Sequence, residues 1–219
     1  MKMHVRRITY SLGFIGSSIV VFSTLLTAFL FRNPNGQPYS FLNQYISELG
    51  QPGISKLAPL FNTGLITGGI LLAIFMIGLG IYCKSKFTYL VGGIGFISMI
   101  GVILVGFFPM NINLAMHLKS AMVFFQGGMI TILLFTLFMI FHKKDKKSKY
   151  PILPGVVTVL VFLAFLFLPA LFNSQHQTLL VPLTNRPIFY LQSFLEWIVF
   201  FSMIFVWIWS VSRYLLKSK

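Results

Sequence analysis

Long runs of apolar residues, separated by short polar connections, dominate the chain. Six of these runs reach the roughly 20 residues that a helix needs to cross the hydrocarbon core of a bilayer. The runs lie at about 8–31, 58–82, 87–108, 114–141, 152–172 and 188–214. The pattern predicts an all-α polytopic membrane protein, a six-transmembrane-helix bundle that forms a single membrane domain over residues 1–219.

The first apolar run follows Lys2, Arg6 and Arg7, as the core of a secretory signal peptide would. The run is longer than the about 7–15 apolar residues of a signal peptide, and no small-x-small cleavage site follows it. We therefore interpret it as a retained span.

The longest connection, residues 32–57, contains a helical pattern on a smaller scale. Its apolar positions fall on one helical face and its polar positions on the other; they are Phe41, Leu42, Tyr45, Ile46 and Leu49, against Asn43, Gln44, Ser47 and Glu48. Ser40 is a favourable N-cap and Gly50 a favourable stop. This predicts a short amphipathic helix in the first outer loop, lying at the interface or folded over the mouth of the bundle.

Composition supports the membrane assignment. Hydrophobic residues make up 57% of the chain and charged residues 9%, against about 45–50% and about 25% in soluble domains. The net charge of +14 could indicate a nucleic-acid partner, but the basic residues stand at the ends of the apolar runs. They are therefore topology signals and contacts for membrane lipids, and we expect no nucleic-acid partner. With Cys83 as the single cysteine, no internal disulfide can form.

The basic residues also predict the orientation. The two termini and the second and fourth connections carry 13 of the 17 Lys and Arg residues, and the other connections with the start of the fourth span carry the remaining four. Cytoplasmic loops hold the excess of Lys and Arg in membrane proteins. We expect a multi-pass protein of the cell membrane with its N- and C-termini in the cytoplasm.

Small residues predict close helix packing. Gly64 and Gly68 form a small-xxx-small pair, and Gly92, Gly93 and Gly95 begin the third span. Such glycines let helix backbones approach closely, within one chain or in a homo-oligomer formed by helix packing.

Only three residues are acidic, and their positions mark a candidate site. Asp145 lies among lysines, whereas Glu48 and Glu196 lie in or beside apolar runs. A charge at membrane depth costs several kcal/mol unless it is paired, protonated or hydrated, so acids there usually have a function.

Polar residues of three spans fall at the depth of these two acids, on the predicted outer side. His117 and Ser120 share a helical face, as do Gln192 and Glu196. Candidate catalytic residues are Ser47, Glu48, His117 and Glu196; candidate ligand-binding residues are Asn43, Asn62, Ser120 and Gln192.

Structural alternatives remain open for these side chains. Glu48 would then be a solvated loop carboxylate, His117 a packing residue near the interface, and Glu196 the acceptor of a structural hydrogen bond. Lys119 points away from His117 and is expected to extend to the headgroups.

A histidine, a carboxylate and a hydroxyl are the minimum for general-base hydrolysis or acyl transfer. The chain has no G-x-S-x-G nucleophile elbow and no glycine-rich phosphate loop. The four histidines, at 4, 117, 142 and 176, have no metal-ligand spacing, so we expect neither a metal nor a cofactor.

The run Tyr45-Ile46-Ser47-Glu48-Leu49-Gly50-Gln51-Pro52 and the segments 60–65, 105–109 and 121–125 resemble an uncharacterised prokaryotic six-span membrane family, domain of unknown function 998. That family is distantly similar to the FRAG/DRAM/SFK family, which has an I-S-E-containing outer loop and a Glu-aromatic pair in its last span, as in Glu196-Trp197. Members of the second family are associated with lipid remodelling and lipid organisation. The resemblance implies a lipid-related role for Ser47, Glu48, His117 and Glu196.

Three functions follow from these patterns. The leading hypothesis is a lipid-interacting membrane protein with an outward-facing polar pocket. The first alternative is a membrane-embedded lipid hydrolase or acyl transferase that uses His117 with a carboxylate. The second is a small transporter, which the mostly apolar inner halves of the spans disfavour, with Gln126 as the chief exception.

Overall fold

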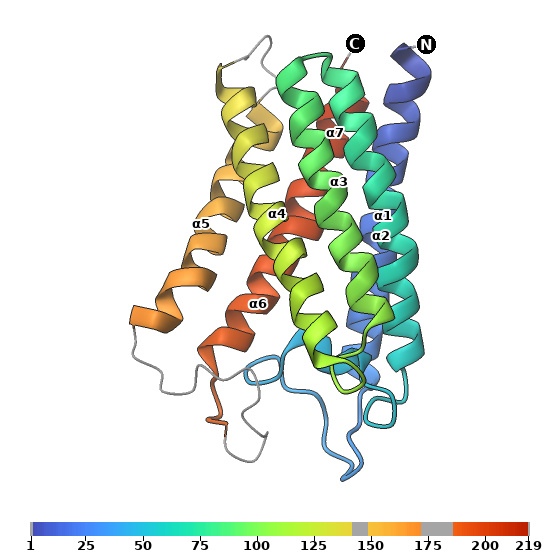
Figure 1. Ribbon diagram of the computed structural model, residues 1–219, viewed down its shortest axis with the longest axis vertical. Helices are drawn as coiled ribbons and strands as arrows, with labels where there is room; N and C mark the ends of the chain where they lie inside the picture. Colours follow the sequence, from blue (N-terminus) through green and yellow to red (C-terminus); the bar gives the residue numbers. More distant parts are fainter. Residues whose placement is uncertain (1, 142–148, 172–185, 219) are drawn as a thin grey trace.

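Six long helices pack side by side along one axis (Figure 1). The computed structural model describes residues 2–141, 149–171 and 186–218. The first five spans are α1 (Lys2–Leu30), α2 (Ala58–Cys83), α3 (Lys86–Phe107), α4 (Leu114–Phe141) and α5 (Lys149–Leu171). The sixth is continuous through α6 (Leu191–Phe201), η4 (Ser202–Trp207) and α7 (Ile208–Lys217). All six are long and apolar enough to cross a membrane, which confirms the predicted bundle.

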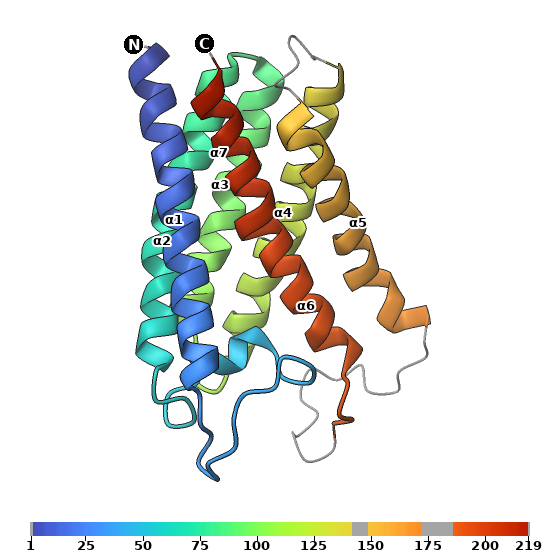
Figure 2. The same ribbon diagram turned by 180° about the vertical axis from the view of Figure 1, so that it is seen from behind.

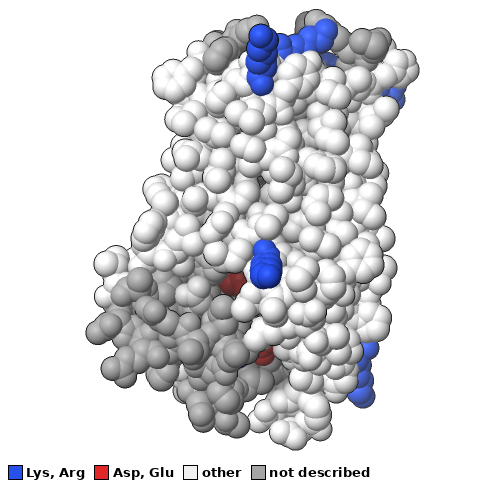
Figure 3. Space-filling view, viewed as in Figure 1, with Lys and Arg blue, Asp and Glu red and all other residues white. Residues whose placement is uncertain are grey.

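The two ends of the bundle differ. Both termini and the α2–α3 turn lie at one end, and residues 31–57, 108–113 and 186–190 lie at the other, here called the first-loop end (Figures 1 and 2). Lys and Arg side chains gather at the end that carries the termini (Figure 3). This separation agrees with the alternation along the sequence of connections that are rich in Lys and Arg and connections that are poor in them.

A two-residue turn reverses the chain between α2 and α3. Lys84 adopts a left-handed conformation, with φ 52°, and ends α2. The Thr88 hydroxyl accepts a hydrogen bond from the Ser85 N–H at 3.2 Å, which caps the beginning of α3. The two helices therefore run antiparallel from the turn and pack along most of their length.

Glycines bring the first three helices into backbone contact. A Cβ atom at Gly64 or Gly68 would collide with Ser23 or Val20 of α1. A Cβ atom at Gly92 would lie 2.7 Å from the Met76 carbonyl oxygen of α2. These predicted packing glycines thus serve contacts within the chain.

Gly92→Ala should lower the thermal unfolding midpoint of the purified protein, because the methyl group meets helix backbone that cannot rotate away. The cost should be about 1–3 kcal/mol. Gly93→Ala is the matched control, since nothing lies within 4 Å of its added Cβ. Equal midpoints for the two variants would contradict a close α2–α3 contact.

The last span contains an irregular turn. Residues Ser202–Trp207 form a π-helix between the α-helical segments α6 and α7. Met203, Ile204, Trp207 and Ile208, in and beside this turn, are completely buried. The span crosses the bundle obliquely between α1 and α5 (Figure 2), so it supplies a large part of the core.

The first loop folds over the end of the bundle, which was one of its two predicted positions. Its only helical segment is a 3-10 helix, η1 (Ile46–Gly50), shorter than the amphipathic helix that the periodicity predicts. Residues 41–44 form a turn instead, in which the Gln44 N–H donates to the Ser40 carbonyl. Gln44 and Glu48, from the polar face of the predicted helix, are buried.

Candidate functional site

Hydrogen bonds fasten the first loop to the bundle. The Ile46 N–H donates to Oε2 of Glu196 at 3.0 Å, and Nδ2 of Asn62 donates to the Gly50 carbonyl at 2.9 Å. The Tyr190 N–H, just before α6, donates to the Leu42 carbonyl at 2.8 Å. These bonds place η1 across the ends of α2 and α6.

An aromatic cluster reinforces the attachment. The Tyr39 hydroxyl lies 2.9 Å and 2.7 Å from the carbonyls of Gln44 and Tyr45, and it accepts a hydrogen bond from Nε1 of Trp197 at 3.1 Å. The Phe41 ring packs on Trp197 with centroids 4.8 Å apart. Burial, followed by the nearby Glu196 and Glu48 carboxylates, raises the pKa of Tyr39 well above its usual value. Its phenol therefore stays protonated at neutral pH.

Glu48 forms a buried ion pair. The residue is 5% exposed, and its Oε1 lies 2.5 Å from a guanidinium nitrogen of Arg186. The Tyr45 N–H and Nε2 of Gln44 also donate to its carboxylate, at 3.1 Å and 3.3 Å. The alternative of a solvated loop carboxylate is therefore wrong. In the space-filling view, acidic atoms are visible only as small recessed areas near the first-loop end (Figure 3).

Arg186 is the residue of this site that the sequence did not single out. Its guanidinium also donates to the Asn43 carbonyl at 3.0 Å, and it lies 5.3 Å from the Tyr45 ring centroid and 5.9 Å from that of Tyr190. One feature of the sequence could have drawn attention to it: Arg186 is the only Lys or Arg between the fifth and sixth apolar runs. A partner 138 positions away has no local pattern that could identify it.

A small cavity of about 40 Å³ lies beneath η1. Its polar lining residues are Ser47, His117 and Glu196, which come from η1, α4 and α6. The other walls are apolar and include Phe61, Leu65, Val102, Val105, Ala121, Phe124, Phe125 and Phe200. A cavity of this size has room for water, whereas a lipid headgroup needs several hundred Å³.

The hydrogen bond of His117 determines which ring nitrogen can act as a base. His117 is 4% exposed, and its Nδ1 lies 2.9 Å from the Phe108 carbonyl oxygen. Because a carbonyl can only accept, Nδ1 carries the hydrogen in the neutral ring. Nε2 is then the nitrogen with a lone pair, ready to accept a proton.

Glu196 and Ser47 complete the polar side of the cavity. Glu196 stands six residues into the last span, about 7.5 Å along the helix axis at 1.5 Å per residue, and it accepts the Ile46 N–H. The Ser47 hydroxyl lies 3.5 Å from the sulfur of Met110. Glu196 therefore accepts a structural hydrogen bond, which was one of the alternatives for this residue, and it also lines the cavity.

The remaining candidates do not line this cavity. Glu48 pairs with Arg186, Asn62 holds Gly50, and the Asn43 amide lies 3.4 Å from the Pro187 carbonyl. The Ser120 hydroxyl donates to the Met116 carbonyl of its own helix at 2.7 Å, and Gln192 is half-buried. Lys119 is exposed, as expected.

Over residues 2–141, 149–171 and 186–218, no three His, Cys, Asp or Glu side chains are grouped so that they could hold a metal ion. His142, His176 and Asp145 lie outside these residues.

Comparison with known proteins identifies the family. The family model described as protein of unknown function (DUF998) matches residues 15–214, which include all the cavity residues. No curated protein and no solved structure matches the chain. The chain belongs to the DUF998 family of proteins of unknown function.

Proposed function

We propose that this integral membrane protein binds the polar end of a membrane lipid at the cavity beneath η1. The observation that carries the proposal is that Ser47, His117 and Glu196, from three separate segments, line one cavity with otherwise apolar walls. Lone pairs of the imidazole and the carboxylate favour a headgroup that donates hydrogen bonds, such as one with hydroxyl or amino groups.

The size of the cavity adds a requirement. A headgroup cannot enter about 40 Å³, so η1 has to move away from the bundle when a lipid binds. The bond between the Ile46 N–H and Glu196 then breaks and frees the carboxylate for the headgroup. In this proposal Glu196 exchanges a backbone partner for a lipid partner.

Lipid retention tests the proposal. Native mass spectrometry of the purified protein should show a co-purifying lipid, and Glu196→Gln should reduce its retention about fivefold, because a hydrogen bond contributes about 0.5–1.5 kcal/mol. The amide oxygen can still accept the Ile46 N–H, so η1 should stay in place.

Gln192→Ala is the matched control for this measurement. Gln192 lies one turn from Glu196 on the same helix and does not line the cavity. Equal lipid retention by the wild type and both variants, or no lipid in any of them, would refute binding at the cavity.

Hydrolysis of a lipid ester is the second candidate function, and the geometry of His117 favours it. Nε2 is the basic nitrogen, and the cavity that it shares with Glu196 has room for the water that hydrolysis consumes. The transporter alternative has less support. Gln126 is exposed, and buried polar side chains in the described spans away from the cavity are hydroxyls.

We also propose that the first-loop end faces outward and the termini face the cytoplasm. In a Cys83→Ala background, a membrane-impermeant maleimide should label Asn35→Cys in intact cells. It should label Lys86→Cys only after the membrane is opened. Both positions are exposed and lie at opposite ends of the bundle. Labelling of Lys86→Cys in intact cells would reverse the assignment.

A further inference from the structure

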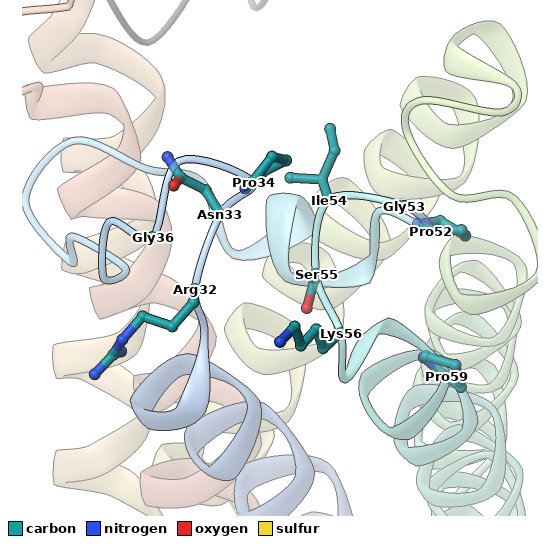
Figure 4. Close-up of a pocket in the computed structure, with 10 residues that line it drawn as sticks. All are labelled: Arg32, Asn33, Pro34, Gly36, Pro52, Gly53, Ile54, Ser55, Lys56 and Pro59. Carbon is teal, nitrogen blue, oxygen red and sulfur yellow. The ribbon is translucent and has the colours of Figure 1, made fainter.

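A second and larger cleft opens at the first-loop end, away from the His117 cavity. It has a volume of about 670 Å³ and lies between residues 32–36, which follow α1, and residues 52–59, which lead into α2 (Figure 4). The two sites share no lining residue. The cleft is large enough for the headgroup of a lipid.

Two cations line this cleft without a carboxylate to neutralise them. Arg32 and Lys56 both line the cleft and are both exposed. The Lys56 side chain extends toward the side on which Arg32 stands, whereas the Arg32 guanidinium points away from Lys56 and donates to the Phe31 carbonyl at 2.6 Å (Figure 4). The only ion pair of Lys or Arg with an acid among the described residues joins Glu48 to Arg186. The charge of the cleft is therefore positive and uncompensated within the described chain.

A buried hydroxyl provides an independent indication of a ligand. Ser55 is 4% exposed, and its Oγ has no hydrogen-bond partner among the described residues. The residue lines the cleft, and its Oγ points to the side where Lys56 lies (Figure 4). Of the unpaired buried hydroxyls among the described residues, Ser55 Oγ is the one that lines this cleft. Buried hydroxyls are normally satisfied, so an unpaired one beside the Lys56 side chain favours an anionic acceptor.

The position of the cleft indicates where this anion comes from. Arg32 follows the last residue of α1, Leu30, by two positions, and Lys56 precedes the first residue of α2, Ala58, by two. Both cations therefore stand where spanning helices leave the hydrocarbon core. Phospholipid phosphates lie at this level of a bilayer, and basic residues there attract anionic lipids.

We propose that the cleft binds the phosphate group of an anionic phospholipid, with Arg32 and Lys56 as its cationic contacts and Ser55 Oγ as a hydrogen-bond donor. This site is separate from the His117 cavity and has a different chemistry, because it is lined by two cations, whereas the other cavity is lined by Ser47, His117 and Glu196. The two sites can therefore fail or succeed independently in experiments.

Native mass spectrometry of the full chain in a neutral detergent, titrated with phosphatidylglycerol, tests the proposal. The double variant Arg32→Gln/Lys56→Gln should weaken binding about thirtyfold. Each basic residue near a membrane surface contributes about 1 kcal/mol, and the loss of two such contributions corresponds to this factor. The control is Lys84→Gln/Lys86→Gln, which removes the same charge at the other end of the bundle and should bind like the wild type.

Ser55→Ala makes the test independent of net charge. Its Oγ makes no hydrogen bond within the described chain, so the thermal unfolding midpoint should be unchanged while phosphatidylglycerol binding falls about fivefold or more. Equal binding by the Arg32/Lys56 and Lys84/Lys86 double variants would overturn the proposal. The proposal would also be overturned if glycerol 3-phosphate, added at millimolar concentration, displaced the lipid and bound with the same affinity as the lipid. The cleft would then be a site for a soluble phosphate.

Discussion

Arg186→Gln should release the first loop from the bundle, because it leaves the Glu48 carboxylate buried without its counter-charge. Breaking one partner of a buried ion pair typically costs about 3–5 kcal/mol. The remaining donors to the carboxylate, the Tyr45 N–H and the Gln44 amide, are neutral. Hydrogen exchange of residues 40–50 should accelerate, and the thermal unfolding midpoint of the protein in detergent should fall.

The double variant Glu48→Gln/Arg186→Gln should be less harmful than the sum of the two single variants, since neither buried charge remains. Arg32→Gln is the control, as an exposed arginine without a carboxylate partner among the described residues. If Arg186→Gln and Arg32→Gln have the same midpoint and the same exchange rates, the pair does not hold the loop.

His117→Ala should produce the largest loss of activity if the protein is a lipid hydrolase. In that reaction Nε2 takes a proton from a cavity water, and the water oxygen attacks the ester carbonyl carbon. The C–O bond to the alcohol then breaks, and the leaving alkoxide takes the proton back from the imidazolium. General-base catalysis contributes about 10²–10⁴ in rate, so turnover should fall by that factor.

Release of fatty acid in ¹⁸O-labelled water is the appropriate measurement, because the label must appear in the carboxylic acid product. Ser120→Ala is the matched control. Ser120 shares the buried face of α4 with His117, but its hydroxyl bonds to its own helix and does not line the cavity. Unlabelled acid, or equal turnover by the wild type and His117→Ala, would remove hydrolysis as a function.

Hydropathy was sufficient to predict the six spans and the shared end of the two termini. The bilayer imposes a fixed length on each apolar run, so the signal is local and strong. The helical depth of His117 and Glu196 could be read from the same pattern, and both line the same cavity. Whether they share a function with Ser47 stays a prediction.

Contacts between distant segments could not be predicted in the same way. Glu48 was predicted beside Glu196 and His117, yet a cation 138 residues later holds it in an ion pair. Asn62 lies at the predicted depth, but it bonds to the Gly50 carbonyl of the loop. The loop itself departs from its helical periodicity, because the bonds from Tyr39 and Glu196 to its backbone favour the turn and the 3-10 helix.

The π-helix of the last span has a consequence for length variation within the family. Each residue of a regular α-helix advances its direction by about 100°. The wider turn at Ser202–Trp207 accommodates one extra residue. The rotation of α7 relative to α6 is therefore the same as in a regular α-helix that has one residue fewer. A relative that lacks one residue here can thus build an unbroken α-helix and still direct Glu196 toward the cavity. A deletion elsewhere between Glu196 and α7 would turn that carboxylate away, so we expect single-residue gaps in alignments of the last span to fall at 202–207.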